Sequence, residues 1–376
     1  MTSELVPVGA FDASAARSPR VDVVVAVHDL TRPVGRAVAS AVGPAAGSPT
    51  GSVRVTVACH ELGAARVANV LDPRLGSSVR LLEVRDGLGS PSGPFNAGFD
   101  AATAPFVSII GSDDFFEPGA LRAWTDRAEA TGADVVMARL RAQSGSGINT
   151  PRARPFRSSR LDPVKDRLAY RTAPLGLLRR ATLDRHALRL DSGVKVGGDL
   201  ALGLRLWALA DRVELGRQDP AYVIGEDAVT RVTTTPRPLT VTLAPYESLL
   251  AQTWFARMPR AYRRAVAIKV LRIHVLGAVV ARGPAGSWSA AETAYLHEVA
   301  RGLVQVERGV LRPFSVADRV LLDACLDPRS DAGRIVTAVA RRAQTSRTGR
   351  LLPPNPLHAL DREGTLRYFV ADRFWR

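Results

Sequence analysis

The sequence has few cysteines and almost no lysine. Its two cysteines, Cys59 and Cys325, are too few and too far apart for a disulfide framework or a zinc cluster, so a reducing compartment is expected. Lysine occurs only at positions 165, 195 and 269, and the other bases are arginines. No apolar run reaches the roughly 20 residues of a membrane-spanning helix, and the N-terminus lacks the pattern of a signal peptide. We therefore expect a cytoplasmic protein.

Acidic residues are also scarce relative to basic ones. The chain has 51 Lys+Arg against 36 Asp+Glu, a formal net charge of +15, and a pI of about 11.0. A positive field attracts nucleotide-sugars, polyanionic polymers, anionic lipid surfaces and nucleic acids. The bases are scattered, however, without a nucleic-acid motif or an interleaved aromatic platform. We therefore expect no nucleic-acid partner, and we expect peripheral contact with the inner face of the plasma membrane at most.

With 376 residues the chain is long enough for two or three domains. Short β-branched runs alternate with helical periodicities in the first part, which predicts a mostly parallel sheet with helical crossovers and hence an α/β fold. After the Pro-bearing loop near 236 the periodicities are helical only. The predicted domains are a loose tail at 1–19, an α/β domain at 20–235, an all-helical unit at 236–343, and a Pro-rich extended tail with a docking aromatic end at 344–376.

Polar residues follow several of the predicted strands directly. His28 and Asp29 follow the run that ends at Val27, and an apolar run at 106–110 is followed closely by Asp113 and Asp114. Open α/β sheets bind their ligands at the carboxyl ends of the strands. A solvated turn would also carry such an acidic pair, so the pair alone leaves both interpretations open.

The order of five motifs resembles glycosyltransferase family 2, whose enzymes have the GT-A fold. The resemblance covers roughly residues 20–235. It rests on the strand-end segments 23–29 and 109–114, the loop 90–98, the strand start 133–136 and the Gly-Gly-Asp-Leu segment 197–200. A weaker resemblance, to the enzymes that glycosylate wall teichoic acid, rests on the helical C-terminal part, the Gly-Pro loop before Asn96, and Ala173-Pro174-Leu175.

The family resemblance implies an inverting transfer from a nucleotide-diphosphate sugar to a hydroxyl group. Asp113, with Asp114 as a second ligand or as a residue that orients metal-bound water, is then expected to bind Mn²⁺ or Mg²⁺. Both ions prefer hard oxygen ligands, and either would neutralise the leaving diphosphate. Asp199 matches the position of the general base that takes the proton of the attacking hydroxyl. A cap for the following helix is the alternative role of Asp199.

The resemblance also implies nucleotide contacts, and we expect a UDP-sugar as donor and a glycan or anionic polymer of the cell envelope as acceptor. Gly93 would let the backbone approach the ligand closely. The expected nucleotide-binding residues are Val27, His28, Asp29, Cys59, His60, Asn96, Ser112 and Asp113. Without the resemblance, we would interpret Cys59 as a small buried hydrophobic residue and His60 as a structural residue at a strand end.

Three departures from the family pattern favour an alternative function. Gly111 replaces a usual acid, Cys59-His60-Glu61 replaces the usual acidic end of the second strand, and Gly198 replaces an acid before Asp199. No histidine lies between His186 and His274 to complete a metal site. The alternative is a catalytically impaired nucleotide-sugar-binding protein of the same fold.

Overall fold

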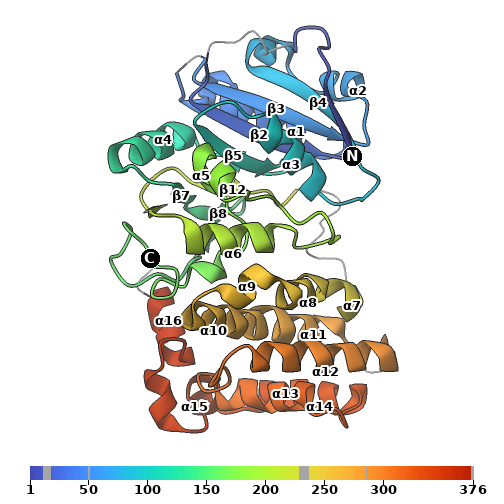
Figure 1. Cartoon of the computed structure of the whole chain (residues 1–376), viewed down its shortest axis with the longest axis vertical. Helices are drawn as coiled ribbons and strands as arrows, with labels where there is room; N and C mark the ends of the chain where they lie inside the picture. The colour runs from blue at the N-terminus through green and yellow to red at the C-terminus, as the bar shows by residue number, and fades with distance from the viewer. Residues whose placement is uncertain (12–17, 50, 228–236, 285–286, 374–376) are drawn as a thin grey trace. The chain divides into compact units, whose positions relative to one another are not determined.

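The computed structural model describes residues 1–11, 18–49, 51–227, 237–284 and 287–373. Contacts divide the chain into two compact units (Figure 1). The first unit comprises residues 1–150, 157–161 and 171–231, and the second comprises 151–156, 162–170 and 232–376. The predicted boundary near 236 therefore lies close to residues 231 and 232, where the chain passes from the first unit to the second for the last time. The prediction placed 151–156 and 162–170 in the α/β domain, whereas the structure places them in the helical unit.

The first unit is built on an eight-stranded sheet in the order β1-β4-β3-β2-β5-β10-β7-β11. Strands β4, β3, β2 and β5 pair in parallel, and β7 pairs in parallel with β11. Strand β1 at the edge and strand β10 between β5 and β7 are antiparallel to their neighbours. The mostly parallel α/β prediction is confirmed. The strands are β1 (Thr2–Leu5), β2 (Val21–Val27), β3 (Val53–His60), β4 (Val79–Arg85), β5 (Phe106–Gly111), β7 (Val135–Ala138), β10 (Gly176–Arg179) and β11 (Val213–Gly216).

Helices cover both faces of this sheet. Alternate residues of a strand point to opposite faces, and accordingly Val57 packs in one cluster with α1 and α4, whereas Ala58 packs in another with α3. The β-branched strands are therefore buried on both sides, which explains why apolar residues occupy both their odd and their even positions. The helices of this unit are α1 (Val34–Val42), α2 (Ala64–Ala68), α3 (Ser92–Ala101), α4 (Ala120–Thr131), α5 (Arg180–Arg185) and α6 (Asp199–Leu209).

A second, four-stranded sheet follows the end of β5. Its order is β6-β12-β8-β9, and β12 pairs antiparallel with β6 so that Tyr222 lies opposite Phe116. The pairing brings a segment more than 100 residues further along the chain next to the predicted acidic pair. The strands are β6 (Phe115–Phe116), β8 (Leu140–Ala142), β9 (Gly147–Ile148) and β12 (Tyr222–Ile224).

The described part of the second unit is helical, as predicted. In Figure 1, α12, α13 and α14 run side by side, and none of the described helices is long and apolar enough to cross a membrane. A π-helical stretch, Val270–Val275, joins α10 to α11. The helices are α7 (Leu239–Thr242), α8 (Ala244–Ala251), α9 (Thr253–Arg257), α10 (Arg260–Lys269), α11 (Leu276–Arg282), α12 (Ala290–Gln305), α13 (Val316–Leu326), α14 (Ala332–Gln344), α15 (Arg347–Leu351) and α16 (Thr365–Arg373).

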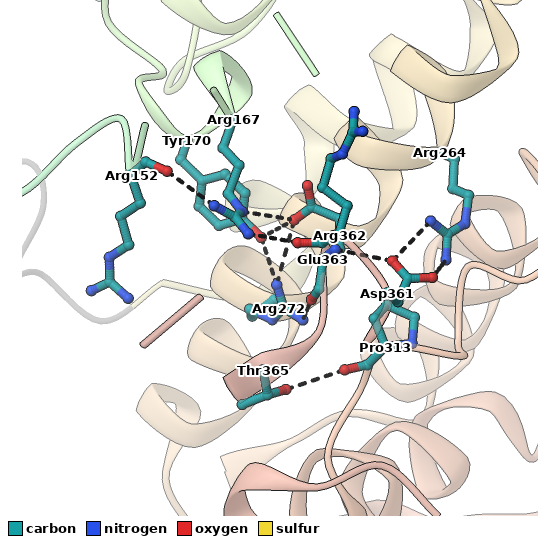
Figure 2. Close-up of polar contacts among 10 residues, drawn as sticks. All are labelled: Arg152, Arg167, Tyr170, Arg264, Arg272, Pro313, Asp361, Arg362, Glu363 and Thr365. Carbon is teal, nitrogen blue, oxygen red and sulfur yellow. Dashed lines mark hydrogen bonds and ion pairs between the residues drawn. The ribbon is translucent and has the colours of Figure 1, made fainter. Parts of the chain in front are cut away.

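The C-terminal segment is anchored by a buried polar cluster within the second unit (Figure 2). Arg272 donates to the Tyr170 hydroxyl at 2.7 Å and to the Glu363 carbonyl at 2.7 Å, and the rings of Tyr170 and Tyr368 are 5.2 Å apart. In the described part of the aromatic end, Tyr368 therefore packs against Tyr170 of the same unit. The predicted extended tail is wrong, because 347–351 and 365–373 are helical.

The predicted loose N-terminal tail is also wrong in part. Thr2–Leu5 forms β1 and pairs with β4 from Thr2↔Arg85 to Leu5↔Leu82. Phe11 is 4% exposed and packs in the main core. Residues 12–17 lie outside the described residues. Strand β1 thus covers the edge of β4, the strand that ends beside the candidate site.

Candidate active site

The carboxyl ends of four neighbouring strands meet at one edge of the large sheet. The register places Val27 opposite Cys59, Ala26 opposite Gly111, and His60 opposite Val84. The residues that follow β2, β3, β4 and β5 therefore gather at this edge, where α/β sheets bind ligands. His28 is exposed and Asp29 half-buried there. Val27 and Cys59 are completely buried, so only their backbone atoms could meet a nucleotide.

The predicted acidic pair follows β5 in a turn, Ser112–Asp114, which we call the acidic turn. Asp113 forms an ion pair with Arg32 through Oδ1, and Arg32 also donates to Ser112 Oγ at 2.7 Å. The side chain of Asp113 is 12% exposed. None of the described residues donates a hydrogen bond to its Oδ2.

Asp114, in contrast, is engaged by the protein through both carboxylate oxygens. Its Oδ2 accepts from the Tyr222 hydroxyl at 2.5 Å and its Oδ1 from Gly225 N at 2.8 Å. Burial raises the pKa of Asp114, although these two hydrogen bonds act in the opposite direction. The structure thus shows Asp114 holding the acidic turn against β12, and its role as a metal ligand stays a prediction.

Two glycines let the backbone close around the acidic turn. A Cβ on Gly225 would lie 1.8 Å from the carbonyl oxygen of Asp113, and a Cβ on Gly111 would lie 2.6 Å from Asp114 Oδ2. The acid that the family resemblance predicts at 111 would therefore collide with Asp114 as it stands. The absence of this acid and the inward orientation of Asp114 are consequences of the same packing.

A second polar cluster follows β3 and β4. His60 Nε2 lies 2.8 Å from Asp86 Oδ1, and Glu61, with a φ of 54°, accepts from Asp86 N and Gly87 N at 2.9 Å each. Burial would raise the pKa of Asp86, but hydrogen bonds from Leu88 N and His60 outweigh it and leave the pKa lowered. The ligand atoms of the three side chains lie within 4.8 Å of one another, as a metal ion requires.

Gly93 has a different role from the predicted one. Its Cβ position lies 1.8 Å from Asp86 Oδ2, an oxygen that has no hydrogen-bond partner among the described atoms. The glycine lets the first turn of α3 approach this buried carboxylate, so the close approach is to Asp86. No contact with a ligand is needed to account for a glycine at this position.

The start of α6 lies against the start of α3. A Cβ on Gly198 would lie 2.1 Å from Ser92 Oγ and 2.6 Å from the Asp191 carbonyl, which explains why an acid is absent before Asp199. Asn96 holds the same loop, since it donates to Leu190 O at 2.9 Å and accepts from Leu190 N at 2.8 Å. A nucleotide contact by Asn96 stays a prediction.

Asp199 is the first residue of α6, and Gly198 occupies the cap position. The alternative that Asp199 caps the helix is therefore wrong, although a carboxylate in the first turn still interacts favourably with the helix dipole. Asp199 is half-buried. Its predicted role as the general base stays a prediction.

Sequence reasoning missed four residues that organise this edge. Arg32 and Arg36 come from the loop after β2 and from α1, and Arg36 binds both the Asp113 carbonyl and Asp227. Tyr222 and Asp86 complete the two clusters. A basic residue just after the first nucleotide-side strand was a readable signal for Arg32. Tyr222 left no signal, because only the tertiary pairing of β12 with β6 brings it to the acidic turn.

Comparisons with known proteins agree with this geometry. Residues 68–187 match the model of "Glycosyl transferase family 2". The succinoglycan biosynthesis protein ExoO of Rhizobium meliloti (strain 1021) is 28% identical over 230 residues, which are 57% of this chain and 63% of that protein. The aligned region thus covers less than two thirds of that relative.

Solved structures of Staphylococcus aureus TarS share the fold. TarS 1–349 in complex with UDP-GlcNAc gives a TM-score of 0.69 at 14% identity, covering 87% of this chain and 93% of that chain, and the complex with UDP gives 0.66. The longer TarS structure gives 0.64, with 54% of that chain covered. At this identity the likeness establishes the GT-A type of fold alone. Residues 68–187 are thus similar to glycosyltransferase family 2, and most of the chain shares the fold of the TarS structures.

Proposed function

We propose that the protein is an inverting, metal-dependent glycosyltransferase. It transfers a sugar from a nucleotide-diphosphate sugar, a UDP-sugar in the first instance, to a hydroxyl group of a cell-envelope glycan or anionic polymer at the cytoplasmic side of the membrane. The observation that carries the proposal is the acidic turn at the common end of parallel strands, where Asp113 Oδ2 accepts no hydrogen bond from the described residues. The match of residues 68–187 to the family model, a relative named for succinoglycan biosynthesis, and a shared fold with a protein solved in complex with UDP-GlcNAc support it.

The donor set of the acidic turn fits a divalent cation. Asp113 places a carboxylate at the sheet edge, and hard oxygen donors suit Mn²⁺ and Mg²⁺. When bound, such an ion neutralises the charge that develops on the leaving diphosphate. Arg32 already lies beside Asp113 and adds a fixed positive charge for the same anion. The His60–Glu61–Asp86 cluster is a second set of donors, but a metal there would have to replace the His60–Asp86 hydrogen bond.

The remaining residues bind the donor and accept the proton. His28 and Asp29, beyond the end of β2, and His60, beside Asp86, are positioned at the edge where the nucleotide is proposed to bind. Asp199 takes the proton from the acceptor hydroxyl as it attacks the anomeric carbon. A single displacement from the face opposite the diphosphate inverts the anomeric configuration and needs no covalent sugar–enzyme intermediate.

A donor screen tests the proposal. Nucleoside diphosphates and their sugars are tested by thermal shift with and without Mn²⁺, because a ligand that binds the folded state raises the melting temperature. The ligand that binds is then used in transfer assays with the Asp113→Ala and Asp199→Ala variants. We expect both variants to lose turnover, whereas Asp211→Ala, which removes an exposed acid of the same unit, stays active. Full activity of Asp199→Ala would reject the assigned base.

The alternative function, a nucleotide-sugar-binding protein without catalysis, is favoured by Gly111 and Gly198. Both positions lack the acids of the family pattern. A Cβ at 198 would meet the Asp191 carbonyl at 2.6 Å, and a Cβ at 111 would meet Asp114 Oδ2 at 2.6 Å. Nucleotide binding that is independent of metal, with no hydrolysis or transfer on any acceptor, would establish this alternative.

A further inference from the structure

The second unit contains a cavity that the proposed active site does not use. It has a volume of about 480 Å³ and lies between the end of α12, the segment before α13 and the segment after α15. Val304, Val310 and Leu311 provide an apolar floor. Arg308, Arg312 and Arg319 with Asn355 and His358 provide the polar lining, and Glu307 is the one acidic residue among the lining residues.

The acceptors at this cavity are already occupied by the protein. Glu307 is bound by Arg260 at 3.1 Å and also by Arg263, so both of its oxygens have cationic partners. The carbonyl of Gly309 accepts from Arg264 at 2.8 Å. Arg264 is in turn fixed by Asp361 at 2.7 Å, a contact that Figure 2 shows. The single carboxylate therefore does not offset the charge of the lining arginines.

Donors, in contrast, remain available. Arg308 and Arg312 are exposed, and neither has an ion pair or side-chain hydrogen bond with any of the described residues. The Asn355 side chain accepts from Leu357 N at 3.1 Å through its oxygen, which leaves its amide hydrogens to donate. Arg319 contributes further charge although it also binds Asp323 at 2.7 Å. The cavity thus combines free N–H donors with an apolar floor.

We infer that this cavity binds a phosphate-bearing repeat of an anionic polymer, which makes it a holding site for the acceptor. That the bound polymer is the acceptor of the transfer rests on the proposed function, whereas the binding of the polymer in the cavity does not. Guanidinium groups bind phosphate through charge-assisted hydrogen bonds, and the apolar floor suits the C–H faces of a sugar or polyol. The lining residues include no Phe, Tyr or Trp on which a nucleobase could stack, so a phosphopolymer is preferred over a nucleic acid.

Binding of a labelled poly(glycerol phosphate) oligomer tests the inference. The Arg308→Glu/Arg312→Glu double variant is compared with Arg334→Glu/Arg347→Glu, which reverses two exposed arginines of the same unit outside the cavity. Both variants change the net charge equally. At about 0.1 M salt, where the Debye length is about 10 Å, we expect at least about tenfold weaker binding for the cavity variant and less than about twofold for the control. An equal loss in both variants, or none in either, would overturn the site.

Two further measurements separate this inference from the proposed function. In a transfer assay the cavity variant should raise KM for the polymer acceptor about tenfold and leave KM for the nucleotide-sugar unchanged. If the protein transfers no sugar but the oligomer binds through the cavity, the proposed function fails and the site stands. Vesicles with about 30% anionic lipid are the third probe. Loss of vesicle binding in the cavity variant without loss of oligomer binding would show a lipid site instead.

Discussion

Replacing Tyr222 with phenylalanine tests how the acidic turn is held. The hydroxyl donates to Asp114 Oδ2 at 2.5 Å and accepts from Gly111 N at 3.1 Å, and the side chain is completely buried. Phenylalanine keeps the ring, which packs edge-on against Phe116 at 5.7 Å, and removes only these two hydrogen bonds. Any effect therefore reports on the hydroxyl group and not on the packing of the ring.

The expected cost follows from the two groups left without a partner. A hydrogen bond to a charged group contributes roughly 1.5–3 kcal/mol and an unsatisfied buried N–H costs roughly 1–3 kcal/mol, so we expect a loss of about 2.5–6 kcal/mol in unfolding free energy. For a unit of this size that corresponds to a melting temperature at least about 5 °C lower. The Tyr222 hydroxyl also opposes the raised pKa of Asp114. Removal of the hydroxyl should raise the pKa of Asp114 further. It should also loosen the acidic turn and so raise the Mn²⁺ concentration needed for half-maximal activity.

Denaturation and metal titration are the measurements, with Tyr170→Phe as the matched control. Tyr170 is also a buried tyrosine whose hydroxyl contacts a carboxylate, Glu363, at 3.2 Å, but it lies in the helical unit. Both variants should lose stability, and only Tyr222→Phe should shift the Mn²⁺ concentration needed for half-maximal activity. If Tyr222→Phe unfolds and titrates with Mn²⁺ like the unmodified protein, the hydroxyl does not hold the acidic turn.

Three further predictions concern stability. Asp22 is fully buried and accepts from Arg54 at 2.7 and 2.9 Å, so Asp22→Asn should lower the unfolding free energy by about 3 kcal/mol in urea denaturation; a loss below about 1 kcal/mol would contradict this. Gly225→Ala places a Cβ 1.8 Å from the Asp113 carbonyl of the acidic turn. Calorimetry should therefore show a lower melting temperature, and metal titration should show weaker Mn²⁺ binding. An unchanged Mn²⁺ titration would refute the close contact. Burial would raise the pKa of Asp166, but Arg154 and two backbone N–H groups outweigh it and the pKa is lowered. Its stabilisation is therefore present above about pH 4 and lost as the pH falls below it, and the melting difference between the protein and Asp166→Asn should shrink toward pH 3 instead of staying constant.

The large sheet could be predicted because its strands are buried on both faces. Val21–Val27 has residues of 0–2% exposure at nearly every position, so the run is apolar except for Asp22, and its limits match the prediction. Strand β1 could not be found in this way. All four of its residues are exposed at the edge of the sheet, and no alternation marks it. The helices α15 and α16 were missed because nearby prolines suggested extended chain. The hydrogen bond from Gly349 N to Ser346 Oγ supports α15, and the burial of Tyr368 supports α16.

The candidate site was predictable only at the strand ends. Asp113 follows an apolar run that can be read directly, and the order of motifs points to Asp199. The partners of these residues come from distant parts of the chain. Arg32 meets Asp113 across 81 positions (113 − 32), and Tyr222 meets Asp114 across 108. Such contacts depend on sheet order, which one sequence leaves undetermined. The inward orientation of Asp114 could not be predicted for the same reason, because it depends on contacts with Tyr222 and Gly225.

The path of the chain between the two units limits how the protein can be divided. The helical unit takes two of its pieces, 151–156 and 162–170, from within the stretch that otherwise builds the sheet unit. A fragment that begins at 232 would leave Arg272 and Glu363 without Tyr170 and Arg167, their neighbours in the buried cluster. A fragment that ends at 231 would expose Leu168 and Ala169, which are buried in the whole chain. Truncation at the apparent domain boundary should therefore give two fragments that aggregate, whereas co-expression or a circular permutant that keeps 151–170 with the helices should remain soluble.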